Sequence, residues 1–408
     1  MDQERLLQRF LTYARIDTTA VENAGTYPSS KGQLELGRLL TEELRSMGLN
    51  DAGQDEHGIV MASVPATAPG APTIALNAHL DTSPETTGAN VRPQVIRNYR
   101  GGDVVLPADP TKVIRPSEVP ELDTVIGKTL ITTDGTTLLG GDDKAGVAVV
   151  MELAAHLLEH PEIAHGPVRI CFTCDEEIGH GVDHVDLTKL GATVCYTLDG
   201  RGADELDVET FSADLATVSV QGVNIHPSIA KGRMVNAIRA AADFVSRLPS
   251  DQSPEMTADR QGFLHPYHIE GGVGGVVMRI ILRDFDTAQL EPKAELLRQA
   301  ARSTEAAFPG TRIDVRITPQ YRNMADGLRK EPRAVAYAQR AMERLGRVPK
   351  LSIIRGGTDG SRFTELGLPT PNLSTGQHCI HSPLEWACLE EMTQAVTVLV
   401  ALLEEWAG

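Results

Sequence analysis

Apolar residues along the chain follow two spacings, which predict helices and strands in alternation. Leucines three and four positions apart at residues 2–16 and 30–47 are typical of helices that pack by one face, and residues 143–158 predict a third helix. Short apolar runs that end at polar residues predict four buried strands, at residues 59–65, 73–81, 167–174 and 192–199. This alternation predicts an α/β domain with a mixed, largely parallel sheet.

The pattern changes near residue 209. From there to residue 321, strands and helices are predicted in the order strand 211–223, helix 234–248, strand 271–285, helix 296–307 and strand 312–320. This order predicts a smaller α+β, ferredoxin-like domain, a lid or dimerisation domain inserted into the first. The α/β pattern then returns, with a helix at 333–345, a strand at 350–356 and a helix at 389–406.

Two domains are therefore predicted, one formed by residues 1–208 and 322–408 and the other by residues 209–321. A chain of 408 residues is long enough for both. Residues 83–130 are rich in proline, glycine and polar side chains, and predict a β-hairpin or an excursion over the site rather than a simple loop.

Composition narrows the class of protein. A net charge of −17 argues against binding to nucleic acid, which needs basic surfaces. No apolar run approaches the roughly 20 residues that span a bilayer, and the first residues lack the features of a signal peptide. Five scattered cysteines favour free thiols in a reducing compartment, so we expect a cytoplasmic protein.

Potential metal ligands lie at or just beyond the ends of the predicted strands. They are His79 and Asp81, Asp142 and Asp143, Glu176 and Glu177, Asp199, and His378 and His381. Functional groups of open α/β sheets collect at the carboxyl ends of the strands. Imidazole and carboxylate together suit zinc or a similar divalent ion, and two neighbouring ions need a carboxylate that bridges them.

Each motif alone also has an ordinary interpretation. Asp142 and Asp143 in GGDDKAG are typical of a helix cap, and the three acids of FTCDEEIGHG are typical of a surface turn. Cys171 and Cys174 form a C-x-x-C inside a predicted strand, where core packing is the expected role rather than redox chemistry. The motifs carry weight because they occur together and in this order.

That ordered set resembles a known family. The segments NAHLDT, TLLGGDDKAG, FTCDEEIGHG, YTLDG and HCIHSP resemble the co-catalytic dizinc exopeptidases, which include carboxypeptidase G and aminoacylase. NIHPSIAKGRMVNA, SPEMT, IILRDFD and IRGGTDG further resemble the tripeptide aminopeptidases of that group. The similarity runs from about residue 5 to about residue 405.

The resemblance implies two Zn²⁺ ions per subunit, with Co²⁺ or Mn²⁺ as substitutes for the same ligands. Asp142 would bridge the two ions. His79 and Asp199 would complete the ligands of one ion, and Glu177 and His381 those of the other.

Further roles are implied around these ligands. Glu176 would remain unligated and act as the general base that takes a proton from the attacking water and passes it to the leaving amine. Asp81 would fix the tautomer of His79. Asp143 stands at a junction that is often a cis peptide in the family, and a plain helix cap stays open for it. His378 is a rival metal ligand, because the chain departs from the family pattern there.

The inserted domain is implied to supply the residues that bind substrate. They are His226, which would stabilise the oxyanion, and Asn236, Arg283 and Arg355, which would hold the peptide backbone or its carboxylate. An ion pair of Arg283 with Asp284 or Asp286 is the structural alternative.

The implied function is that of a metal-dependent aminopeptidase that releases the N-terminal residue of tripeptides. Two alternatives stay open: an amidohydrolase or carboxypeptidase that acts on N-acyl amino acids or dipeptides, and a non-catalytic metal-binding protein on the same fold. The expected partners are a small peptide substrate and a second subunit, bound through the inserted domain as a homodimer. Nucleic acid and membranes are not expected partners.

Overall fold

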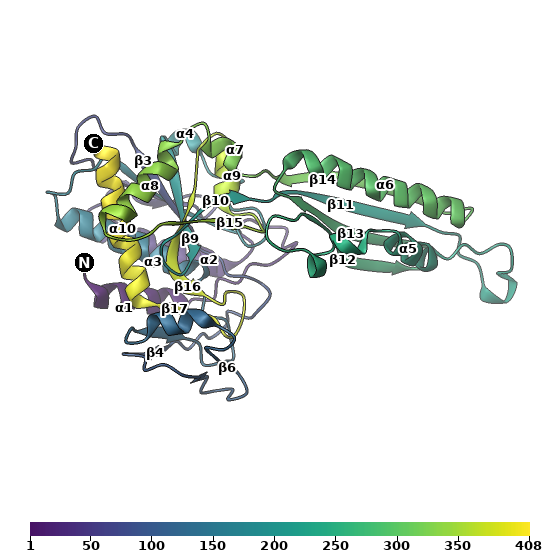
Figure 1. The fold of residues 1–408 in the computed structure, drawn as a ribbon, viewed down its shortest axis with the longest axis horizontal. Coiled ribbons are helices and arrows are strands. Elements are labelled where there is room, and N and C mark those ends of the chain that lie inside the picture. The colour runs from purple at the N-terminus through teal and green to yellow at the C-terminus, as the bar shows by residue number, and fades with distance from the viewer. The chain divides into compact units, whose positions relative to one another are not determined.

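The computed structural model describes all 408 residues, which form two compact units (Figure 1). Unit 1 comprises residues 1–208, 324–353 and 358–408, and unit 2 comprises residues 209–323 and 354–357. The predicted boundaries at 208 and 321 did not include the short return of 354–357. Residues 354–356 are the end of the strand predicted at 350–356, which was assigned wholly to the first domain. The carbonyl of Ile354 instead accepts a hydrogen bond from the N–H of Phe211, which is also in unit 2.

Unit 1 is built on an eleven-stranded sheet with the order β1-β2-β8-β3-β9-β16-β17-β7-β4; in addition, β10 pairs with β16, and β15 pairs with β10. The strands are β1 (Gly53–Gln54), β2 (Val60–Val64), β3 (Ile74–His79), β4 (Gln94–Ile96), β7 (Leu130–Thr132), β8 (Val168–Thr173), β9 (Val194–Arg201), β10 (Glu205–Thr210), β15 (Lys350–Ile354), β16 (Asn372–His378) and β17 (Trp386–Cys388). Parallel pairing joins β8, β3, β9 and β16, whereas the flanking pairs are antiparallel. The mixed α/β class is confirmed, with the parallel part confined to the centre.

Helices pack on both faces of this sheet. Successive residues of a central strand point to opposite faces, so each strand contributes side chains to two cores. In β3, for example, Leu76 lies in the larger core and Ala75 in the smaller one. The larger core contains side chains of α1 (Gln3–Ala14), α2 (Lys31–Ser46), α3 (Gly141–Glu159), α8 (Arg333–Arg344) and α10 (Leu389–Ala407). The smaller core contains side chains of α4 (Leu187–Leu190) and α9 (Asp359–Glu365).

The five helices of the larger core confirm the helices predicted for this domain, within a few residues at each end. A short helix that was not predicted, α7 (Ala325–Leu328), precedes α8. The structure contains no helix that combines the length and the apolar character needed to cross a membrane.

Residues 83–130 form an excursion with a small core of its own. It carries β4, the hairpin of β5 (Val104–Val105) and β6 (Val113–Ile114), and a 3-10 helix at Pro120–Val125. Apolar side chains of this segment pack against Trp386 of β17. The predicted β-hairpin is therefore confirmed, in a segment that joins the sheet through β4 and packs against β17.

Unit 2 is a four-stranded antiparallel sheet with the order β12-β13-β11-β14. Its strands are β11 (Ser212–Gln221), β12 (Phe263–Gly272), β13 (Gly275–Asp284) and β14 (Arg312–Tyr321), and its helices are α5 (Ala237–Ser246) and α6 (Leu290–Ala307). These helices and the sheet share one core. The sequence did not predict β12, because Pro266, two histidines and Glu270 interrupt its apolar pattern. β12 lies at an edge, where a proline is tolerated.

Candidate metal centre

The ends of the central strands bring the candidate ligands of unit 1 together. Because β3, β8, β9 and β16 are parallel, their carboxyl ends lie along the same edge of the sheet. Each candidate stands at or beyond such an end, or at the start of a helix: His79 ends β3, Glu176 and Glu177 follow β8, Asp199 lies near the end of β9, His381 follows β16, and Asp142 lies in the first turn of α3.

Asp142 lies between two histidines. Its Oδ1 is 3.0 Å from Nε2 of His79, and its Oδ2 is 3.2 Å from Nε2 of His381. The same nitrogen of His381 is 3.0 Å from Oε2 of Glu177, and Nε2 of His79 is 3.8 Å from Oδ1 of Asp199. The cluster thus has two halves that share Asp142. We call His79 and Asp199 the inner half-site, and His381 and Glu177 the outer half-site.

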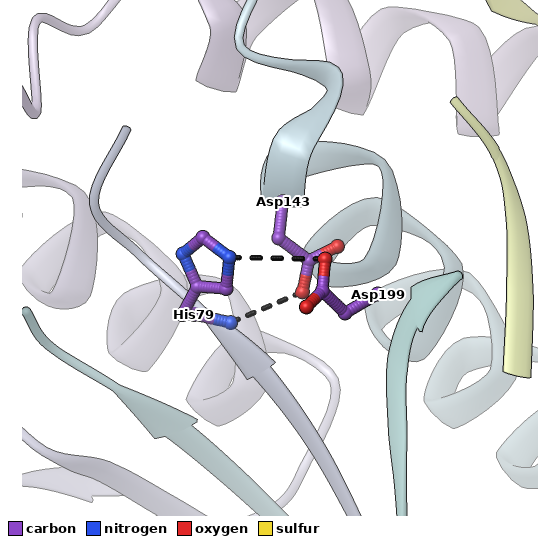
Figure 2. A group of neighbouring side chains, drawn as sticks. All are labelled: His79, Asp143 and Asp199. Carbon is purple, nitrogen blue, oxygen red and sulfur yellow. Dashed lines mark hydrogen bonds and ion pairs between the residues drawn. The ribbon is translucent and has the colours of Figure 1, made fainter. Parts of the chain in front are cut away.

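Asp143 supports the inner half-site, as Figure 2 shows. Its Oδ2 accepts a hydrogen bond from the backbone N–H of His79 at 3.1 Å, and its carboxylate faces that of Asp199. Its Oδ1 accepts a hydrogen bond from the N–H of Gly146, which is the bond of a helix cap. The Asp142–Asp143 peptide bond is cis. Both interpretations of Asp143 therefore apply, since the helix cap also holds the backbone of a candidate ligand.

The contacts of the two histidines raise their pKa values and so favour their protonated forms. Burial alone would lower the pKa of His381, but hydrogen bonds to Asp142 and Glu177 raise it to about 11. Burial also opposes the charged form of His79, yet its contacts with Asp142 and Asp81 hold its pKa well above the usual value. Burial would raise the pKa of Asp142, but the two histidines lower it below its usual value.

The charged forms of the remaining carboxylates are disfavoured by burial. Burial raises the pKa of Glu177 to about 7, and the charge of Asp142 adds to this. Burial also raises the pKa of Asp199 and of Glu176 well above the usual range, with further contributions from neighbouring carboxylates. Such a concentration of buried negative charge is stabilised when divalent cations lie between the groups.

The donor set fits divalent cations. The ligand atoms of His79, Asp143 and Asp199 lie within 4.8 Å of one another, and so do those of His79, Asp142 and Glu177. Oε1 of Glu177 is buried and accepts no hydrogen bond, which leaves it available to a cation. Imidazole and carboxylate oxygen are ligands that zinc and similar ions share.

Asp81 joins the two ligand-bearing strand ends. It is fully buried, and its Oδ1 lies 3.3 Å from Nδ1 of His79. Its two carboxylate oxygens each accept a backbone N–H, one from Glu176 and one from Glu177, both at 3.0 Å. Asp81 therefore holds the backbone of the Glu176–Glu177 turn in addition to the imidazole of His79.

The first acid of that turn, Asp175, is buried and does not face solvent. Its carboxylate accepts hydrogen bonds from the N–H of Ser29 at 2.6 Å and from Nε2 of Gln33 at 2.7 Å. Its own N–H donates to Oε1 of Gln33 at 3.0 Å. The sequence suggested no role for Asp175, because these partners lie more than 140 positions away. The contacts tie the turn to the start of α2.

Two further buried side chains support the ligands and were not predicted. Gln377, on β16, donates from Nε2 to Oδ1 of Asp199 at 3.1 Å. Glu385, four residues after His381, accepts backbone hydrogen bonds from the loop that carries Asp142. No local sequence pattern marks either residue, because each acts through a distant segment of the chain.

His378 does not take part in the cluster, so the interpretation of it as a rival ligand is wrong. Its Nε2 lies 2.8 Å from Oε2 of the buried Glu391, and its ring stacks on Trp386 with centroids 3.8 Å apart. Cys171 and Cys174 are buried and not bonded to each other, and burial raises the pKa of both thiols. Core packing accounts for them.

The four residues implied to bind substrate all belong to unit 2, where only two are in contact. Arg283 donates from Nη1 to the carbonyl of Arg355 at 3.2 Å, and both guanidinium groups lie near the ring of Phe263. His226 is exposed and bonds to Ser228. Asn236 caps α5.

The two arginines differ in their partners. The guanidinium of Arg355 donates to the carbonyls of Asp259 and Gln261, so its donors are engaged by backbone. Nε of Arg283 is buried without a partner. The alternative ion pair of Arg283 with Asp284 does not form, because Asp284 pairs instead with Lys293 at 2.8 Å. Arg283 is therefore the better placed of the two to receive a carboxylate.

Known proteins resemble this chain over its whole length. Residues 134–405 match the model of the peptidase family M20/M25/M40. A Peptidase T of Geobacillus kaustophilus is 43% identical over 403 residues, which cover 98% of each chain. The solved structure of aminopeptidase PepT from Bacillus cereus matches with a TM-score of 0.77 and 26% identity over 100% of both chains. A dinuclear metal-binding peptidase of the M20 family from Bacillus subtilis has the same fold, with a TM-score of 0.63 and 15% identity over 98% of this chain and 97% of that one.

Proposed function

Because the chain belongs to the peptidase family M20/M25/M40, we propose that it is a metal-dependent aminopeptidase that releases the N-terminal residue of tripeptides. One observation carries the proposal most directly. The two carboxylate oxygens of Asp142 face two different histidines, which is the arrangement that a carboxylate bridging two cations requires. The substrate class comes from the resemblance of residues 224–237, 253–257, 280–286 and 354–360 to the tripeptide aminopeptidases.

We assign two Zn²⁺ ions to this cluster, with Co²⁺ or Mn²⁺ as substitutes. His79 and Asp199 would hold one ion, His381 and Glu177 would hold the other, and Asp142 would bind both. When bound, such ions act as Lewis acids on the scissile carbonyl and make a water molecule acidic enough to attack it near neutral pH.

Glu176 is the general base in this proposal. Its Oε2 lies 3.9 Å from Nε2 of His79, at the edge of the ligand cluster. Asp81 holds its backbone N–H, which fixes where the side chain starts. Glu176 would take a proton from the attacking water on a carboxylate oxygen and give it to the nitrogen of the leaving amine. Because burial raises its pKa, it is suited to both transfers.

Arg283 is the proposed partner of the peptide carboxylate, because the guanidinium fork binds carboxylates in a bidentate manner. The absence of a carboxylate partner within unit 2 supports this role. His226 is proposed to act on the oxyanion, and Asn236 and Arg355 to bind the backbone or the carboxylate of the peptide. In this structure Asn236 caps α5, and Arg355 donates to the loop at 257–261.

A homodimer through unit 2 is also proposed. The strand β12 lies at an edge of its sheet and exposes Tyr267 and Ile269, with 45% and 60% of their surfaces accessible. An exposed edge strand with apolar side chains is a surface suited to pairing with a second copy. We place the enzyme in the cytoplasm, which the five free cysteines support.

The decisive experiment compares a free tripeptide with its N-acetyl form, using protein whose metal content has been measured. We expect cleavage of the free tripeptide only, with loss of activity on chelation and recovery on addition of Zn²⁺. Preferential cleavage of the acetylated form would favour the amidohydrolase instead. Metal binding without cleavage of either form would favour the non-catalytic alternative.

A further inference from the structure

We infer that Glu385 is a positioning residue for the metal centre: it holds the loop that carries Asp142 in the place where that carboxylate can serve both half-sites. The inference rests on the proposed function. It concerns a residue outside the ligand set, and one whose partners lie almost 250 positions away in the sequence.

The side chain of Glu385 makes three hydrogen bonds to this loop. Its Oε2 accepts from the backbone N–H of Leu139 at 2.7 Å and from that of Gly140 at 2.8 Å. Its Oε1 accepts from the N–H of Asp142 at 3.0 Å. Only 1% of its surface is exposed. A buried carboxylate whose oxygens both engage backbone N–H groups constrains those groups far more than an exposed one.

The first turn of α3 needs an acceptor from outside the helix. Gly140 is the N-cap of α3 and has no side chain. Asp143 caps the helix further on, at the N–H of Gly146, so the N–H of Asp142 needs an acceptor from another segment. Glu385 supplies both the acceptor oxygens and the negative charge that a helix N-terminus favours. The carboxylate that caps α3 therefore also sets the backbone from which Asp142 extends.

Two glycines allow Glu385 to come this close. Gly140 has a φ of +78°, in the left-handed region that favours glycine. A Cβ at Gly141 would lie only 3.1 Å from Oε1 of Glu385. The two glycines before Asp142 are therefore explained by the close approach of the loop to the carboxylate of Glu385.

Glu385 also connects Asp142 with His381. The backbone N–H of Glu385 donates to the carbonyl of Ser382, which closes the turn directly after His381. One residue therefore belongs to the turn that presents His381 and bonds to the loop that presents Asp142. The distance of 3.2 Å between His381 Nε2 and Asp142 Oδ2 depends on both segments.

The test is Glu385→Gln in the full-length enzyme. The amide keeps the shape of the side chain, but one oxygen becomes a donor that meets a backbone N–H. We expect Zn²⁺ affinity, measured by competition with a chromophoric chelator, to fall by about 10–100-fold, as for other groups that orient ligands. We expect kcat to fall by a similar factor with KM within about twofold, and the visible spectrum of the Co²⁺-loaded enzyme to change.

Glu390→Gln is the matched control. Glu390 accepts a backbone hydrogen bond from Thr129 at 2.8 Å and has no contact with the metal ligands. Its substitution should leave Zn²⁺ affinity and the Co²⁺ spectrum unchanged. An equal loss of Zn²⁺ affinity in both variants would overturn the inference, and so would a Glu385→Gln enzyme that loses only thermal stability.

If Glu385→Gln does not fold, Gly141→Ala replaces it. The added methyl group lies in close contact with Oε1 of Glu385 and shifts the loop relative to it, while the chemical nature of the carboxylate is unchanged. We expect a smaller loss of Zn²⁺ affinity in the same direction, and unchanged affinity would overturn the inference. The wild-type enzyme is assayed alongside. If it neither binds Zn²⁺ nor cleaves a tripeptide, the proposed function itself fails, whereas identical wild-type and variant affinities reject only the role of Glu385.

Discussion

The inner and outer half-sites contain the same kinds of donor but differ in burial and support. His79 ends a central strand and is 2% exposed, and Asp81, which orients it, is fully buried. The side chain of His381 lies in a loop and is 30% exposed. Its second nitrogen lies 3.4 Å from Oε2 of Glu85, whose side chain is 70% exposed.

The difference shows two ways to place a ligand. The sheet itself places the inner ligands, because adjacent parallel strands fix the separation of His79 and Asp199. The outer ligands lie on turns, which hold their place through hydrogen bonds such as that from Thr86 to the carbonyl of His381 at 2.7 Å. We therefore expect the inner half-site to retain its cation more firmly.

Asp142→Ala removes the ligand that the two half-sites share and should cause the largest loss of activity. Both cations should be lost together, whereas His381→Ala should leave the inner one. Each cation contributes several kcal/mol to transition-state stabilisation, and since each 1.36 kcal/mol is a factor of ten, kcat/KM should fall by about 10⁴-fold or more. Metal analysis of the two variants gives the comparison, and one equivalent of metal retained by Asp142→Ala would contradict a shared ligand.

Glu176→Gln separates catalysis from metal binding. Because Glu176 contacts the cluster without being assigned as a ligand, both cations should remain while kcat falls by about 10²–10⁴-fold. The measurement is kcat with metal content on the same preparation. A variant that keeps nearly full activity would show that another group takes the proton.

Asp81→Asn and Glu85→Gln compare the groups that support the two histidines. Asp81 is buried and holds the N–H groups of Glu176 and Glu177 as well as His79, so its loss should lower metal affinity or kcat/KM by about 10–100-fold. Glu85 is largely exposed and makes one contact, so its loss should cost less than about threefold, as exposed ion pairs do. Equal losses of metal affinity and kcat/KM in the two variants would mean that the difference in burial does not make the support of His79 more important than that of His381.

The ligands could be predicted from the sequence because residue type and position both carry information. His79 and Asp199 are polar residues at the ends of apolar runs, and such ends collect at one edge of an α/β sheet. β16 was not predicted, although it is fully buried, because NLSTGQH has few apolar residues. Its polar side chains instead bond within the sheet, as Asn372 does with the N–H of Asp199.

The supporting residues could not be predicted, for a physical reason. Asp175, Gln377 and Glu385 act through hydrogen bonds to segments more than 140 residues away, and such bonds leave no periodicity or spacing in the sequence. A carboxylate that accepts backbone N–H groups looks, in the sequence, like any surface acid. The roles of these supporting residues can therefore be recognised only in the folded structure, where the distant segments lie together.

The smallest effect is on the stability of the metal-free protein, and it has a definite sign. The pKa of His381, raised to about 11, lies above its value of about 6.5 in an unfolded chain. Its stabilising contribution is therefore complete below pH 6.5 and is lost as the pH rises through about 11. Glu177, with a pKa raised to about 7, acts in the same direction at lower pH, since its buried charge destabilises the fold as the pH rises from about 4.5 to about 7 and adds no further change above that.

Because of His381, the melting temperature of chelator-treated protein should fall between pH 7 and pH 10, by about 1–2 °C for each kcal/mol lost in a chain of this length. The metal-loaded enzyme should not show this fall, because cations bind the deprotonated histidines and gain affinity as the pH rises. His381→Ala removes the contribution of the outer half-site, so its metal-free form should lose less stability over this range while the contribution of the buried His79 persists. A wild-type melting temperature that stays constant or rises would mean that His381 is not held as a cation between Asp142 and Glu177 before the metal binds.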